Sequence, residues 1–430
     1  MHKRLRWNAM LMGDGSTARV PKAVAQVRSS AVVEDTSHIG ATIRLLRMAA
    51  DLTQNQLAEQ ANVSVSLLDQ VEGADRAVTP ALLAALGRAL KVPVERLTGQ
   101  PYIDDHRDEQ VHRDIDALRE VLRRYGLPAD QPARSLPELT DDVAELDRLH
   151  RNADYRKLAA RLPGLVEELT VAAHQASPAT TETVHGLVTV AYRTAHFLLH
   201  HLGYADLAEA VEHKLALAAE RSGDPLAQAL VHWTRNQTLQ QVGDYAHGLR
   251  LLDIARAGLE DQLRRPTPAA LTVYGSLHLS SAYLAAQSGD ATTTRDHLAA
   301  ARELATRLGG SDQVHYGLTF GPATVITYEV AAHVEAGDAA AALVAAEGYA
   351  PPRNMPRLRR GYHYLHLARA HLLHGDGDGC LRALDQARRI APQQTRLHPL
   401  VRDTIAVLIS LHRRAQPDLT DYAGWLGIPS

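Results

Sequence analysis

The feature that most constrains the fold of this 430-residue chain is a glycine turn that recurs, in varied form, along its C-terminal part. A glycine followed by Asp or Tyr stands between two helical patterns at intervals of about forty to fifty residues. The five turns are Gly203-Tyr204, Gly243-Asp244, Gly289-Asp290, Gly337-Asp338 and Gly375-Asp376. A recurring turn between paired helices is typical of repeat architectures, in which each pair packs mainly on its neighbours. The sequence therefore predicts an α-solenoid.

Small residues follow these turns at fixed distances. Five positions after the glycine stand Ala208, Gly248, Thr294, Ala342 and Cys380. Twelve positions after it, three of the copies have alanine: Ala255, Ala301 and Ala387. Small side chains at those places allow the two helices of a pair to approach closely. Because the intervals are long and uneven, we expect lengthened helices and an irregular solenoid with a concave face.

Composition agrees with an all-α fold and limits the class of protein. Apolar residues make up 45% of the chain but aromatic residues only 4%, so Ala and Leu must build most of the interior, which suits helices better than sheets. No convincing strand pattern occurs after about residue 141. The single cysteine, Cys380, allows no internal disulfide, and no apolar run has the length of a signal peptide or a membrane span. We therefore expect a cytoplasmic protein that has no membrane partner.

A more specific pattern lies in residues 39–98. Helical patterns over residues 39–49 and 79–91 flank two shorter ones, and the longer flanking helices are expected to close a common core. The first short helix has a good N-cap in Thr53. One face of this helix carries three residues suited to burial: Leu57, Ala58 and Ala61.

The chain must then turn sharply into the second short helix. Asn62 stands at the turn and tolerates left-handed backbone dihedrals, and Val63 follows as its apolar plug. Ser64 caps the second helix, on which Leu68 and Val71 form the buried stripe. Two short helices at a steep angle, with a small alanine at their contact, fit the helix-turn-helix pattern.

On these residues the stretch resembles the Xre family of phage-repressor-type regulators. The resemblance covers about sixty residues and rests on Ile43-Arg44-Leu45-Leu46-Arg47, Leu52-Thr53-Gln54, Leu57-Ala58, Val63-Ser64, Gln70-Val71-Glu72-Gly73 and Pro93-Val94-Glu95-Arg96-Leu97. It implies a five-helix, lambda-repressor-like domain whose second motif helix enters the major groove of double-stranded DNA. The base readers that it implies are Ser64, Val65, Ser66, Asp69 and Gln70. Gln54, at the positive N-terminal end of the preceding helix, is expected to meet a phosphate.

The stretch departs from the family pattern in its turn and in its charge. Asn62 replaces the usual glycine, and Val65 and Asp69 stand where polar or basic residues are more common. Residues 38–100 carry as many acidic as basic side chains, so their net charge is zero. DNA affinity would then depend on dimerisation, on a basic N-terminal arm or on a small number of phosphate contacts. The alternative is an adaptor that does not bind DNA and uses its repeats for protein–protein interaction.

The array of glycine turns resembles tetratricopeptide repeats, most closely in the copy from Tyr364 to Pro392. A repressor-type head joined to such an array is similar to regulators of Gram-positive bacteria, and Phe320-Gly321-Pro322-Ala323 resembles a group from actinomycetes. The resemblance implies a homodimer whose array binds a peptide, a small molecule or a partner protein and thereby shifts DNA affinity. The residues expected to line its groove, chosen because they can pair with a peptide backbone, are Arg235, Asn236, Gln240, His278, Tyr283, Tyr328 and His333.

Other patterns argue against catalysis. Three pairs of histidines have helical spacing but no carboxylate or cysteine beside them at a metalloenzyme spacing: His196 with His200, His363 with His366, and His371 with His374. The sequence shows no glycine-rich phosphate loop, nucleophile elbow or paired-carboxylate constellation. We therefore expect no enzyme activity, no metal site and no cofactor.

These patterns divide the chain into four predicted parts. Residues 1–37 form a flexible basic arm, 38–100 the helix-turn-helix domain, 101–140 a helical connector and 141–430 the repeat domain. The expected protein is a sequence-specific transcription regulator of the cytoplasm, associated with the nucleoid. No local pattern encodes its effector, its operator or the sign of its regulation.

Overall fold

The computed structural model describes residues 39–50, 52–72, 78, 80–90, 92, 97, 109–124, 127–128, 130–411 and 417–428. Apart from one short β-hairpin, the regular elements of these residues are α-helices, which confirms the predicted all-α class. The expected basic arm, residues 1–37, lies outside the described residues. None of the helices in the described ranges is both long enough and apolar enough to cross a membrane.

The N-terminal part contains four described helices. They are α2 (Ile39–Ala49), α3 (Gln54–Ala61), α4 (Val65–Glu72) and α5 (Pro80–Leu90). Their common core is aliphatic, and Ile43, Leu57 and Leu68 are fully buried in it. The resemblance implies a fifth helix; residues 93–96, which belong to the stretch that carries the resemblance, lie outside the described residues, and Leu97 is buried in the same core.

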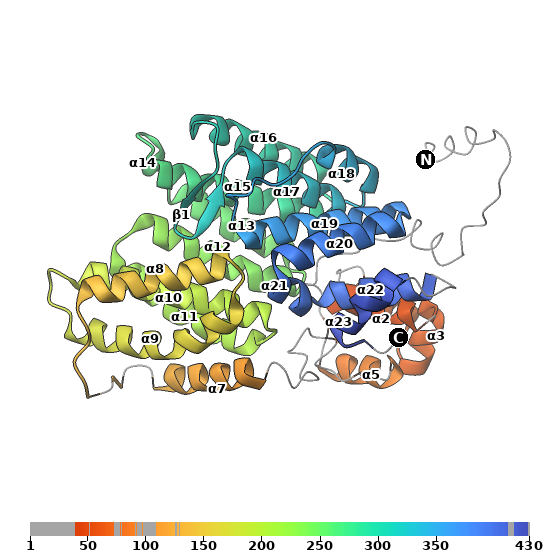
Figure 1. Cartoon of the computed structure of the whole chain (residues 1–430), viewed down its shortest axis with the longest axis horizontal. Helices are drawn as coiled ribbons and strands as arrows, with labels where there is room; N and C mark the ends of the chain where they lie inside the picture. Colours follow the sequence, from red (N-terminus) through yellow and green to blue (C-terminus); the bar gives the residue numbers. More distant parts are fainter. Residues whose placement is uncertain are drawn as a thin grey trace. The chain divides into compact units, whose positions relative to one another are not determined.

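The long C-terminal part consists of antiparallel helix pairs that follow one another along the chain (Figure 1). The pairs are α8 (Leu136–Arg151) with α9 (Tyr155–Gln175), α10 (Thr181–His201) with α11 (Ala205–Ser222), α12 (Pro225–Gln241) with α13 (Tyr245–Ala257), α15 (Pro268–Gln287) with α16 (Ala291–Arg307), α17 (Pro322–Glu335) with α18 (Ala339–Ala346), and α19 (Arg357–His374) with α20 (Gly377–Ile390). The two helices of a pair, such as α19 and α20, pack side by side. This arrangement confirms the predicted helical solenoid.

Shorter or unpaired helices complete this part of the fold. They are α7 (Glu109–Arg123), α14 (Glu260–Leu263), α21 (Pro392–Leu397), α22 (Pro399–Leu411) and α23 (Pro417–Leu426). α7 lies within the predicted connector, and its Val111, Ile115 and Leu118 are buried in the same core as side chains of α8 to α11.

All five predicted turn glycines have left-handed backbone conformations between paired helices. Their φ angles lie between 74° and 85°, a region that residues with a Cβ atom adopt only at a cost. The turn between α8 and α9 belongs to the same class, but its left-handed residue is Ala153, with a φ of 55°. Because this turn lacks the glycine, it was not recognised in the sequence as a sixth copy.

The small residues that follow the turns lie between the paired helices, as the sequence predicts. Ala301, Ala342, Cys380 and Ala387 are fully buried. A Cβ atom on Gly248 would come within 2.5 Å of the side chains of Asn236 and Leu284. Larger residues at these positions would therefore force the helices apart.

One β-hairpin connects α16 to α17, a feature that the sequence patterns do not predict. Strands β1 (Gln313–His315) and β2 (Leu318–Phe320) pair antiparallel. Phe320 is fully buried, and its ring lies against α15 at Gly275, where a Cβ atom would come within 2.0 Å of the ring. Strands of three residues are too short to produce a recognisable alternation of polar and apolar residues.

The last helix pair returns to the first. Leu358 of α19 and Ala391 belong to the core that α7 to α11 form. Gln393 of α21 bridges to the start of α9: its Oε1 accepts a hydrogen bond from the Arg156 backbone N–H at 2.9 Å, and its Nε2 donates to Asp154 Oδ1 at 3.2 Å. These contacts enclose a space among helices that are far apart in the sequence.

Candidate DNA-binding surface and candidate ligand cavity

The turn between α3 and α4 has the local geometry that the sequence predicts. Thr53 caps α3 in a capping box: its hydroxyl accepts from the Gln56 N–H at 3.2 Å, and Gln56 Oε1 accepts from the Thr53 N–H at 2.8 Å. Asn62 ends α3 in the left-handed region, with φ 54° and ψ 47°. Ser64 Oγ accepts from the Leu67 N–H at 3.1 Å and so caps α4.

The core beneath this turn also agrees with the prediction. Its buried residues are Leu57, Ala58 and Ala61 of α3 and Leu68 and Val71 of α4. Val63 packs against this core as the partly buried plug of the turn. The buried core fixes the direction in which the exposed side of α4 faces.

The five residues implied as base readers are all exposed. They lie before and along the exposed side of α4: Ser64, Val65, Ser66, Asp69 and Gln70. Val65 is 40% exposed, which is unusual for a large apolar side chain in this fold. An apolar group at such a position can contact the methyl group of thymine. The base-reading role of these residues stays a prediction.

Gln54 is held by α4. Its Nε2 donates to Asp69 Oδ1 at 3.1 Å and to Glu72 Oε2 at 3.0 Å. The buried Glu72 also accepts from Nε and Nη2 of Arg47 at 2.7 and 2.8 Å, so the network links α2, α3 and α4. Because both amide hydrogens of Gln54 are used, a phosphate would meet backbone N–H groups at the start of α3 in this conformation. The phosphate contact of Gln54 also stays a prediction.

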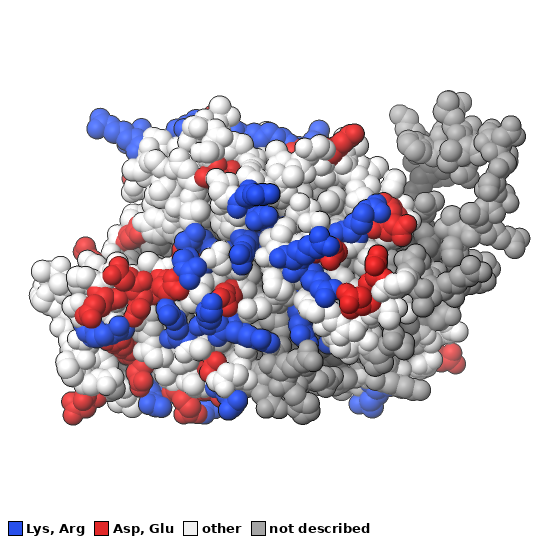
Figure 2. Space-filling view, viewed as in Figure 1, with Lys and Arg blue, Asp and Glu red and all other residues white. Residues whose placement is uncertain are grey.

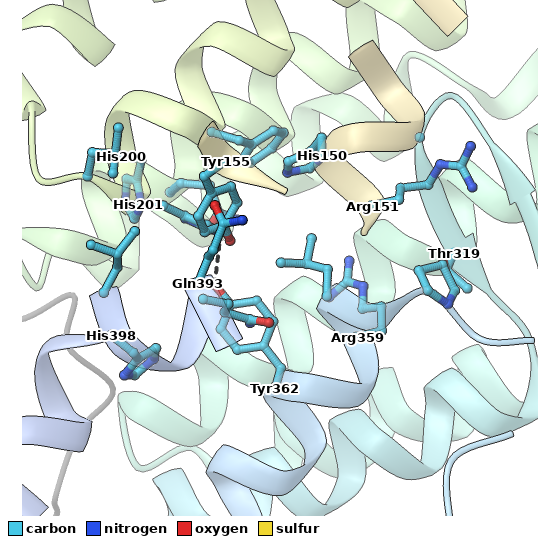
Figure 3. A pocket seen from close by; sticks show the side chains of 18 of the residues that line it. His150, Arg151, Tyr155, His200, His201, Thr319, Arg359, Tyr362, Gln393 and His398 are labelled. Carbon is cyan, nitrogen blue, oxygen red and sulfur yellow. Dashed lines mark hydrogen bonds between the residues drawn. The ribbon is translucent and has the colours of Figure 1, made fainter. Parts of the chain in front are cut away.

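The helical array encloses a cavity of about 240 Å³. Its walls come from α7 to α10, α12, α15, β2, α17, α19 and α21. Figure 3 shows side chains from early and late helices around one space, with His200, His201 and His398 on one side of the view and Arg151, Thr319 and Arg359 on the other. The cavity therefore exists only because distant helix pairs close on one another.

The charged side chains of the lining are cationic. Five arginines line the cavity: Arg151, Arg156, Arg193, Arg359 and Arg396. None of the described residues that form its wall is Asp or Glu. Figure 2 shows Lys and Arg side chains gathered around the C-terminal end of α8 and the first turns of α9 and α19. The surface beside the cavity is therefore positively charged as well.

Arg193 is the most buried of these arginines. Its side chain is 6% exposed, and its Nη2 lies 3.8 Å from Asp147 Oδ1. Asp147 also accepts a hydrogen bond from Arg151 Nε at 2.9 Å. Burial lowers the pKa of Arg193, and the nearby Asp147 opposes this shift. One carboxylate is thus shared by two arginines, which leaves an excess positive charge in the cavity wall.

Three other titratable groups of the lining are uncharged near neutral pH. Burial lowers the pKa of His150 to about 4; Asp147 opposes this shift and Arg193 adds to it. Burial also places the pKa of His201 well below and the pKa of Tyr155 well above the ordinary value. These groups therefore offer neutral imidazoles and a phenolic hydroxyl, which can donate hydrogen bonds.

Several buried polar atoms of the lining have no hydrogen-bond partner in the described part of the chain. They are His150 Nε2, Tyr155 Oη, and Oε1 and Nε2 of Gln394. The three residues are 8%, 1% and 3% exposed, respectively. Buried polar groups in folded proteins nearly always bond to protein, ordered water or a ligand. These atoms are closed to solvent as well as to protein partners, so their hydrogen bonding is incomplete in this conformation.

An aromatic wall lies beside these polar groups. The rings of Phe197 and Trp233 meet edge to face with centroids 5.4 Å apart, and His150 stacks on Phe197 at 5.1 Å. Trp233 Nε1 donates to Ser280 Oγ at 2.6 Å, which fixes the indole. An apolar wall with a few convergent polar groups is the usual composition of a small-molecule site.

Comparisons with known proteins bear on the N-terminal part. Residues 38–98 match the family model described as a helix-turn-helix domain. This part of the chain is a helix-turn-helix domain. None of the curated proteins matches the chain. A solved structure that does match is the crystal structure of Bacillus thuringiensis PlcR in complex with the peptide PapR7 and DNA. The two sequences are 14% identical, and the match covers 63% of this chain and 95% of that one. The TM-score is 0.28, so no structural argument rests on this match.

Outside the helix-turn-helix domain, the structure brings together three of the seven residues expected to line a groove. Gln240, Tyr283 and Tyr328 line the cavity. The lining does not include the other four, Arg235, Asn236, His278 and His333. The ligand role of all seven stays a prediction. Within the described ranges, no group of three or more His, Cys, Asp or Glu residues is placed to hold a metal ion.

Most of the cavity lining could not be recognised in the sequence. Arg359 and Gln394 lie in ordinary helical patterns, and nothing local indicates that they face the same space as Phe197. One signal was available: Arg193 is a charged residue within the largely apolar stretch of α10. A buried charge of this kind is rare unless it is paired or functional.

Proposed function

We propose that this protein is a sequence-specific DNA-binding transcription regulator whose helical array binds a ligand and thereby sets DNA affinity. The observation that carries the proposal is the exposed side of α4 on a domain whose capped turn and buried core are intact. In helix-turn-helix proteins, this helix enters the major groove and reads base edges. The cavity supports the regulatory half of the proposal because it combines an aromatic wall with arginine side chains.

The proposed regulator is an Xre-type homodimer. Two domains of zero net charge gain affinity by binding two half-sites at once, which compensates for their weak attraction to phosphates. A dimer of this kind reads a palindrome-like operator whose half-sites lie about one helical turn apart. The effector is a peptide, a small molecule or a partner protein that binds the array.

The test is a selection from a random double-stranded DNA library with the purified full chain at near-physiological salt. Gln70→Ala removes an exposed side chain of α4, and Gln60→Ala removes the same side chain from an exposed position on α3. We expect the unmodified chain and Gln60→Ala to enrich the same palindrome-like motif. Gln70→Ala should bind that motif roughly tenfold more weakly, because one good side-chain contact with a base contributes about 1–3 kcal/mol of discrimination.

The adaptor is the second candidate, and the zero net charge of residues 38–100 is the observation that favours it. An adaptor would show only weak, sequence-blind binding that falls steeply with salt. A selection without an enriched motif, or equal binding by Gln70→Ala and the unmodified chain, would contradict the assignment of a reading role to α4.

A further inference from the structure

The chemistry of the cavity narrows the class of ligand. We propose that the array binds a small organic anion, whose acidic group lies against Arg193 and Arg359 and whose apolar body lies against Phe197 and Trp233. This inference rests on the proposed function in one respect: the bound molecule is taken to be the effector. Binding of the anion to the cavity can be measured without DNA.

The anionic end follows from the arginines. Arg193 shares the single carboxylate of Asp147 with a second arginine. Arg359 Nη1 donates to the Tyr328 hydroxyl at 2.9 Å, and the guanidinium lies 5.3 Å from the centre of that ring. Arg359 forms no ion pair with an Asp or Glu among the described residues. Guanidinium groups bind carboxylates and other oxyanions through paired, charge-assisted hydrogen bonds, which strengthen away from water.

The neutral groups of the lining point to the same class of ligand. Burial keeps His150 and Tyr155 uncharged near neutral pH, so neither group offsets the positive charge of the arginines. A cationic ligand would face the excess charge of the arginines, and no lining carboxylate is present to balance it. The wall therefore selects against cations and accepts anions.

The size of the cavity and its aromatic wall define the rest of the molecule. A volume of about 240 Å³ lies just below the usual range of ligand pockets, which begins at about 300 Å³. This volume suits a compact molecule of two or three rings. The edge-to-face rings of Phe197 and Trp233 supply an apolar surface for such a body.

Two fluorescent probes of nearly the same shape test the proposal with the full chain and without DNA. Anilinonaphthalene sulfonate carries a negative charge, and phenylnaphthylamine is its uncharged analogue. We expect saturable binding of the sulfonate with one site per chain. Arg359→Gln and Arg193→Gln should each weaken sulfonate binding by roughly tenfold or more, because each removes a charge-assisted hydrogen bond. Binding of phenylnaphthylamine should change little.

The matched control is Arg264→Gln, which removes an 83% exposed arginine outside the cavity lining and should leave both affinities unchanged. Circular dichroism and the urea midpoint establish that each variant is folded. If Arg193→Gln does not fold, the less buried Arg359 decides the test. The proposal is overturned if the sulfonate shows no saturable binding, or if the arginine variants weaken both probes equally. Neither result changes the outcome of the DNA selection. The experiments therefore distinguish a wrong ligand class from a wrong assignment as a DNA-binding regulator.

Discussion

At the scale of single residues, one residue in the left-handed backbone region sets the turn within each described helix pair, and in five of the six pairs that residue is a glycine. Gly289 has a φ of 78°, and a Cβ atom added to it would meet no other atom within 4 Å. A substitution there therefore changes backbone strain without changing packing. Gly258, at the end of α13, has an ordinary φ of −64° and serves as the comparison.

We expect Gly289→Ala to lower the free energy of unfolding by about 1 kcal/mol, because alanine is strained in the left-handed region. Gly289→Asn should cost less, since asparagine tolerates this conformation better than most residues. Gly258→Ala should cost little, because its backbone already has helical dihedrals. Urea unfolding followed by circular dichroism measures all three. Equal losses for Ala and Asn at position 289 would contradict the strain argument.

The sequence predicted the helix caps and turns, because these depend on residues that are close together in the chain. The caps at Thr53 and Ser64 and the turn at Asn62 involve residues three or four positions apart, so their chemistry is visible in the sequence. The clamp between Gln54 and Glu72 was not visible, because it depends on how α3 meets α4. The turn at Ala153 was not visible for the same reason. Sequence patterns place a glycine at a left-handed turn, whereas here the buried alanine takes that conformation within a packed core.

At the scale of elements, the β-hairpin fits the array through one close contact. The Phe320 ring occupies the space that a side chain at Gly275 would need, so this hairpin and α15 are matched in shape. The sequence predicted the helices on either side because their periodicity extends over several turns. It did not predict the hairpin, whose strands are shorter than any reliable periodic signal.

Gly275→Ala should therefore lower the free energy of unfolding by about 1–3 kcal/mol, the usual cost of overpacking a core. Gly186→Ala in α10 is the matched control: no atom lies within 4 Å of its added Cβ, and it should raise stability by about 0.5–1 kcal/mol through helix propensity. Combining Gly275→Ala with Phe320→Leu should cost less than the sum of the two changes, because leucine removes the ring that clashes. If the two substitutions lower the free energy of unfolding additively, the contact between the Phe320 ring and position 275 does not limit the packing of α15.

At the scale of the whole molecule, the array brings together what the sequence keeps apart. The solenoid was predictable from its turns, whereas the cavity depends on the last helix pair returning to the first through Leu358 and Gln393. Long-range closure leaves no local signature, so the sequence identified only Gln240, Tyr283 and Tyr328 among the cavity residues. The same long-range packing also buries histidines, with consequences for stability in acid.

His363 is the clearest case. It is fully buried, and neither ring nitrogen has a hydrogen-bond partner among the described residues. Burial lowers its pKa from 6.5 to about 4. The unfolded chain takes up a proton near pH 6.5 but the folded chain only near pH 4, so the stabilising contribution is complete above pH 6.5 and is lost as the pH falls toward 4. At about pH 5 the loss from this one residue is about 2 kcal/mol.

The free energy of unfolding of the unmodified chain should therefore fall between about pH 7.5 and about pH 5, and His363→Phe should lose about 2 kcal/mol less over this interval. Phenylalanine cannot be protonated, and its ring can keep the edge contact with Tyr349, whose centroid lies 5.1 Å from that of His363. His213→Gln removes an exposed histidine of α11 and should follow the unmodified chain. Urea unfolding at both pH values gives the comparison. If His363→Phe and the unmodified chain lose the same stability, the folded protein must accommodate a proton at His363, and the acid sensitivity must arise from other groups such as the buried His150.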